Sequence, residues 1–234
     1  MSEPPVSAPD DDQMRLATVE LVGALAYGQL RAVEAAARLI GLAPDARTAD
    51  VVSEVVGQEL HAYRALREHL ATLTELPSAV MDRQKPHFDA YFDRAPLDDW
   101  FGASVFFALG LPIASDFARA VGPQLDEETA RVVTEAIADR SRFERGAIEQ
   151  LAAQMTDEET RERARQITAD LLGRALTSYQ GAVGETDALK VLLAAGTDDA
   201  RTAEQRVKRL AIEVLNAHRR RAVELGLEDL DDVR

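Results

Sequence analysis

Apolar residues recur every three or four positions along this chain, and this spacing constrains the fold more than any other feature. Between Met14 and Ile40 they form one continuous stripe, which is typical of an amphipathic helix with one buried face. Similar patterns return in the later segments, and no segment alternates apolar and polar residues as a half-buried strand would. The sequence therefore predicts an all-α protein.

The predicted helices group into two hairpins with short loops, and a longer stretch with three prolines (residues 74–96) joins them. So long a connection suits a crossover, because adjacent bundle helices usually need only about two to eight connecting residues. We expect an acidic tail over residues 1–13, a four-helix core over 14–155, C-terminal helices packed on the same domain over 156–227, and an acidic end over 228–234.

Composition excludes several classes of function. The 234-residue chain has no cysteine, so disulfides and thiolate chemistry are absent. A net charge of −14 opposes contact with a phosphate backbone, and nucleic acid is not the expected partner. The longest uncharged run, residues 100–115, is interrupted by glycine and Pro112 and is shorter than the roughly 20 apolar residues of a membrane span. We expect a cytoplasmic protein in which this run is a buried, kinked core helix.

A few polar residues lie where the helices should meet. Gln29 is the one polar member of the first stripe and is predicted to be a buried core glutamine. Gln58 and His61 lie three apart, the spacing at which a bundle that holds two metal ions places a Glu-x-x-His pair. Moving the second helix forward by 81 residues puts Gln58 on Asp139 and His61 on Arg142, as expected if each hairpin supplied half of a shared site.

Four segments resemble one family. LVGALAYGQL (21–30), APLDDWFGASVFFALGLPIASDF (95–117), LLGRALTSYQGAVGETDALKVLL (171–193) and NAHRRRAVELGL (216–227) are similar to ferritin-like proteins related to the tRNA hydroxylases that act on 2-methylthio-isopentenyl-adenosine. The resemblance covers roughly residues 14–227. It implies a ferritin-like four-helix bundle with a carboxylate-bridged di-iron centre, held by one Glu from each of two helices and an acidic-x-x-His pair from each of the others.

The ligand positions that the resemblance implies are mostly changed here. Gln29 and Gln58 replace glutamates and Arg142 replaces a histidine, while His61 and Asp139 are kept. The acids expected near Gly102 or Leu111, on the third predicted helix (100–121), are missing. An amide cancels no metal charge, and a guanidinium repels a cation. We therefore expect these five positions to be the vestige of a metal site, with no catalytic residue and no cofactor; iron or manganese would be the metal if one were bound.

Two views of the second helix remain open. The resemblance places His61 inside the bundle, whereas a helical wheel turns it away from the stripe that contains Val51. If His61 is buried, Arg142 would occupy the place of the metal charge, paired with Asp139 and hydrogen-bonded by the glutamine amides. The run 218–221, one His followed by three Arg, is expected to be a solvated helix end.

Three functions follow from this sequence. The first, which we prefer, is a non-catalytic binding or scaffolding module, homodimeric by analogy with other bundles. The second is an oxygen-dependent di-iron hydroxylase that acts on a tRNA base, as the resemblance implies. The third is a carrier of a small apolar ligand held in a cavity between helices.

Overall fold

The computed structural model describes residues 10–138, 140–185, 188–195 and 200–227, and this part of the chain is helical without any strand. The prediction of an all-α protein is confirmed. The elements are α1 (Asp11–Ile40), α2 (Ala46–Leu73), α3 (Pro77–Phe92), α4 (Trp100–Val105), the π-helical η1 (Phe106–Gly110), α5 (Leu111–Val121), the 3-10 turn η2 (Gly122–Gln124), α6 (Glu127–Ala138), α7 (Arg140–Gln154), α8 (Glu158–Glu185), α9 (Ala188–Ala194) and α10 (Ala200–Glu224).

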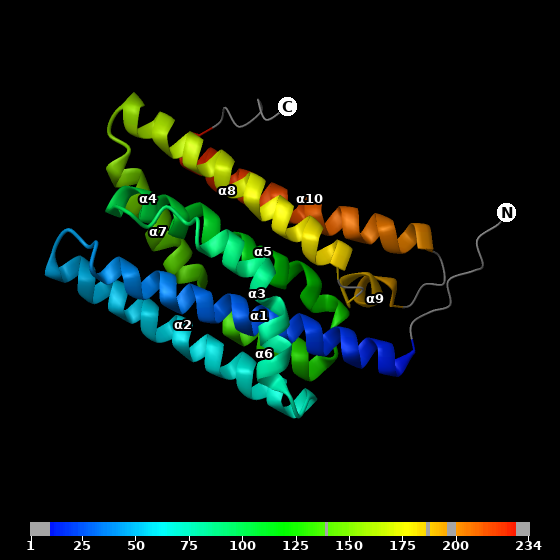
Figure 1. Cartoon of the computed structure of the whole chain (residues 1–234). Coiled ribbons are helices and arrows are strands. Elements are labelled where there is room, and N and C mark those ends of the chain that lie inside the picture. Colours follow the sequence, from blue (N-terminus) through cyan, green and yellow to red (C-terminus); the bar gives the residue numbers. More distant parts are fainter. Residues whose placement is uncertain (1–9, 139, 186–187, 196–199, 228–234) are drawn as a thin grey trace.

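The helices lie in three rough layers (Figure 1). Helices α1 and α2 form a hairpin along one side, and α8 and α10 lie along the opposite side. The continuous helix α4–η1–α5 lies between them and packs on α6, α7, α8 and α10. Helix α3 lies in the predicted crossover and contacts both α1 and α8. The two hairpins, α1–α2 and α4–α7, are therefore joined as the loop lengths indicated.

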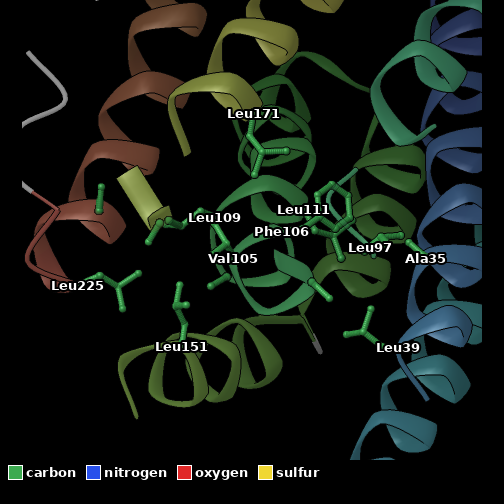
Figure 2. Close-up of a cluster of buried hydrophobic side chains, with 14 of the residues drawn as sticks. Ala35, Leu39, Leu97, Val105, Phe106, Leu109, Leu111, Leu151, Leu171 and Leu225 are labelled. Carbon is green, nitrogen blue, oxygen red and sulfur yellow. The ribbon is translucent and has the colours of Figure 1, made fainter. Parts of the chain in front are cut away.

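The central helix supplies the core. Val105, Phe106 and Leu109 are completely buried. Figure 2 shows Leu151 from α7 and Leu171 from α8 pointing toward this helix. The stretch Trp100–Gln124 is long and apolar enough for a membrane span by length and composition, but 72% of its most apolar window is buried inside the bundle. Its apolar surface is thus covered by other helices, as predicted for a core helix.

The central helix is irregular just before its proline. In η1 the N–H of Leu111 bonds to the carbonyl of Phe106, five residues earlier instead of four. Pro112 follows directly and has no N–H to offer the preceding turn, which disturbs an ordinary α-helix. Near Pro112, where a kink is expected, the structure thus has a widened turn. Such turns are frequent at functional positions.

Aspartate side chains cap several helices, and the first of these helices begins earlier than expected. Asp10 caps α1, so residues 10–13 are not a tail. Asp45 caps α2 and accepts the Thr48 N–H at 2.8 Å. Asp157 plays the same role for α8, where it accepts the Thr160 N–H at 2.9 Å. Aspartate is among the preferred residues at this position, because its carboxylate accepts a free N–H of the first turn.

Candidate functional site

Gln29 of α1 and Glu59 of α2 meet where the first two helices pack. Both side chains are buried, with 7% and 5% of their surface exposed. Gln29 Nε2 donates a hydrogen bond to the Glu59 carboxylate and another, at 3.1 Å, to the Glu59 backbone carbonyl. The burial predicted for Gln29 is confirmed. The partner is a residue that sequence reasoning missed.

The inward face of α2 is one residue away from the predicted one. The helix turns Glu59 and Ala62 inward, both buried, whereas Gln58 is half-buried and His61 is exposed. Of the two open views of His61, the structure therefore agrees with the exposed one, and the inward pair at this spacing is Glu59 and Ala62. Consecutive residues are about 100° apart on a helix, so a shift of one changes the face completely.

The stripe on α2 contains the signal that would have found Glu59. Val52, Leu66 and Leu70 are buried, and Glu59 and Ala62 fall at helical spacing between them. Val51, which the wheel used as an inward residue, is 57% exposed. Taking Val52 in place of Val51 as the start of the stripe places a carboxylate in the interior and an alanine where a histidine ligand would lie.

On the central helix, Leu111 and Ser115 are buried beside the same region. The neighbouring acid, Asp116, is also buried but pairs with cations elsewhere. It accepts hydrogen bonds from Arg221 of α10 at 3.2 Å and from Arg119 at 3.0 Å. This acid was not considered in the sequence reasoning, and its carboxylate is occupied by two guanidinium groups.

The last two of the five vestigial positions are Asp139 and Arg142. Asp139 lies outside the residues that the structure describes, and the side chain of Arg142 is not described either. The hypothesis that Arg142 replaces the metal charge and pairs with Asp139 therefore stays a prediction.

The described residues do not fit a di-iron centre. Such a centre takes one Glu from each of two helices and a Glu-x-x-His pair from each of two others. Here α1 offers the amide of Gln29, α2 offers Glu59 with Ala62 three residues later, and α5 offers Leu111 and Ser115. Within the described ranges no three His, Cys, Asp or Glu side chains are grouped to hold a metal ion.

Two hollows flank the Gln29–Glu59 pair. The larger, about 520 Å³, lies between α2, the central helix and α7, and Glu59 lines it. The smaller, about 190 Å³, is bounded by α1, α3, α5, α8 and α10, and Gln29 lines it. Leu111 and Ser115 border both hollows. The Gln29–Glu59 pair thus adjoins space of ligand size.

The basic run at the end of α10 is also different from its prediction. His218 is 1% exposed, and its Nδ1 lies 3.2 Å from the Leu109 carbonyl oxygen in η1. Arg221 is turned inward to Asp116, and its side chain is 12% exposed. Since two of the four residues pack on the central helix, the expectation of a solvated run is wrong at His218 and Arg221, while Arg219 and Arg220 are exposed.

The structure has two helical hairpins with a crossover helix between them, and polar residues lie where the first hairpin meets the central helix. These features define the ferritin-like class of all-α proteins. Residues 12–196 match the family model described as "Ferritin-like domain, actinomycetes", and the chain belongs to this family. No curated protein matches the chain in a sequence comparison. The family description names a fold and no reaction, so function has to be argued from the site.

Proposed function

We propose that this protein is a ferritin-like bundle without a di-iron centre, and that it acts as a non-catalytic binding module for a small molecule. The observation that carries the proposal is the hydrogen bond from Gln29 to Glu59, in the interior position where metal-binding relatives of this fold would hold carboxylate ligands.

The chemistry of that pair argues against a bound metal. A di-iron centre needs anionic oxygen ligands to offset the charge of the two ions. Gln29 is neutral, and its amide nitrogen points at the Glu59 carboxylate as a donor. A carboxylate that accepts this bond has part of its lone-pair capacity used in joining α1 to α2. The pair thus acts as an interhelical contact.

The hollows beside the pair favour a small-molecule ligand over a purely scaffolding role. Ligand sites in proteins are concave and mostly apolar, with a few polar groups that orient the ligand. Both hollows have this character, with Gln29, Glu59 and Ser115 among mainly apolar walls. The hydroxylase implied by the resemblance would need a metal at the same place and is the alternative that an experiment must separate.

Elemental analysis of tag-free protein, before and after anaerobic loading with iron(II), tests this proposal. We expect far less than one equivalent of iron or manganese per chain in both samples. About two equivalents, lost in Glu59→Ala and kept in the control Glu135→Ala, would overturn the proposal and favour a hydroxylase. Glu135 is a suitable control because it is an acid on the exposed side of α6.

A further inference from the structure

We propose that the smaller hollow binds an uncharged molecule about the size of one aromatic ring that carries one hydrogen-bond acceptor, and that the Tyr91 hydroxyl is the donor to this acceptor. An aromatic ketone has this chemistry. The inference rests on the proposed function as a binding module and adds the ligand class and the residue that recognises it.

The size of the hollow limits the ligand to roughly one ring. Its volume is about 190 Å³. An engineered apolar cavity of about 150 Å³ in another protein binds benzene. A ring with two or three further heavy atoms is therefore a suitable occupant, whereas a nucleoside is too large.

The walls of the hollow select an uncharged ligand. They are mostly aliphatic and aromatic, and among its described lining residues there is no Asp, Glu, Lys or Arg. A charge placed here would lose its hydration without an ionic partner, which is strongly unfavourable. Phe88 of α3 and Leu215 of α10 are typical of the lining.

The Tyr91 hydroxyl provides the polar contact. Its oxygen is buried and has no hydrogen-bond partner, although Tyr91 lines the hollow. Burial raises the pKa of this hydroxyl far above its ordinary value, so the group keeps its proton and can donate. A buried donor without an acceptor is unfavourable, and a ligand oxygen at this point would remove that cost.

The surroundings hold the hydroxyl in place. The Tyr91 ring packs edge-on against Phe92, with 5.6 Å between ring centroids, and lies 5.9 Å from the Phe106 ring. Its hydroxyl faces Gly110 in the widened turn η1, where a Cβ atom would come within 2.9 Å of the oxygen. Gly110 thus leaves room for the Tyr91 hydroxyl, and the side chain of any other residue would reduce that room.

Two probes of nearly equal shape separate the hydrogen bond from simple filling of the hollow. Acetophenone carries a carbonyl oxygen where α-methylstyrene carries a methylene group. Titration calorimetry with the full chain should give about tenfold tighter binding of acetophenone, as one added hydrogen bond implies. In Tyr91→Phe the preference for acetophenone should be lost or reversed, because its carbonyl oxygen would be buried without a donor.

The variants also separate the outcomes. Tyr91→Phe should fold normally because its hydroxyl has no protein partner to lose. Ala211→Leu, which adds side-chain volume to the α10 wall, should weaken both probes. If both probes bind equally to the unchanged protein, Tyr91 is not the donor that we propose, while the binding function stands. If neither probe binds, the inference fails; if in addition two equivalents of iron are found, the proposed function fails as well.

Discussion

The Nδ1 atom of His218 donates a hydrogen bond to the carbonyl oxygen of Leu109, 3.2 Å away, and so ties α10 to the π-helical turn of the central helix. The other ring nitrogen, Nε2, is buried without a partner. Burial in the first place, and Arg221 in the second, lower the pKa of His218 from 6.5 to about 4, while the Leu109 bond and Asp116 act in the opposite direction. The folded protein therefore holds this histidine neutral.

This geometry predicts an acid-sensitive contribution to stability. Between pH 6.5 and about 4 the unfolded chain binds a proton at His218 that the folded chain excludes. The contribution is fully present above pH 6.5 and is lost as the pH falls toward 4, by about 3 kcal/mol in total. Urea denaturation of the unchanged protein and of His218→Asn at several pH values measures it. Asparagine keeps a hydrogen-bond donor but does not titrate, so the stability of the His218→Asn protein should depend less on pH. Parallel plots of unfolding free energy against pH for the two proteins would contradict the prediction.

Asp116 should be the most sensitive ion-pair partner in the described part of the chain. Its carboxylate is 7% exposed and accepts bonds from both Arg221 and Arg119. Asp116→Asn should cost about 3–5 kcal/mol, because the buried Arg221 guanidinium loses its anion. Arg119 keeps its pair with Glu144. Arg221→Met should cost less, since Arg119 still contacts Asp116.

Urea midpoints of these two variants can be compared with that of Arg131→Met. The Arg131–Glu135 pair is well exposed, at 58% and 64%, so its loss should change stability by less than about 1 kcal/mol. An Asp116→Asn protein as stable as Arg131→Met would show that the buried pair has no net structural role.

Replacing Gln29 by methionine tests its bond to Glu59. Methionine has a similar shape but no donor, so Glu59 loses a charge-assisted hydrogen bond in a buried place. We expect a loss of about 1–3 kcal/mol in chemical denaturation. The matched control is Gln166→Met, because Gln166 donates to Glu162 at 3.0 Å on the exposed side of α8. Equal changes in both variants would show that the interior pair contributes nothing special.

Two helical glycines should respond to alanine in opposite directions. A Cβ at Gly102 would lie 2.6 Å from the Pro96 carbonyl oxygen, which is backbone and cannot easily move. Gly102→Ala should therefore lose about 1–3 kcal/mol. At Gly57 of α2 nothing lies within 4 Å, so Gly57→Ala should gain up to about 1 kcal/mol. Thermal unfolding distinguishes them, and a stable Gly102→Ala would mean that α4 does not approach residue 96 so closely.

The sequence-based hypothesis for Arg142 makes a separate prediction. If its guanidinium stands in for the metal charge inside the bundle, Arg142→Ala should lose several kcal/mol, since buried charges then remain without their counter-ion. Denaturation of this variant beside Arg145→Ala, whose residue is exposed on α7, measures the difference. An Arg142→Ala protein with unchanged stability would contradict the hypothesis.

The sequence by itself determined the helical class, the two hairpins with their crossover, the buried central helix and the irregularity near Pro112. These features depend on spacing and on local chemistry, such as the missing N–H of proline and the three- and four-residue period of apolar side chains. The burial of Gln29 was predictable for the same reason, because it interrupts an otherwise apolar stripe.

Only the tertiary structure decided which residues meet. Whether α2 turns Gln58 or Glu59 inward is a rotation of about 100°, and apolar residues flank both faces, so the packing of α1 and α6 against the helix had to settle it. His218 and Tyr91 acquired their environments in the same way. Their neighbours, Leu109 and Gly110, belong to another helix. Only the packing of that helix gives the His218 ring a buried acceptor at the Leu109 carbonyl and leaves room for the Tyr91 hydroxyl beside Gly110.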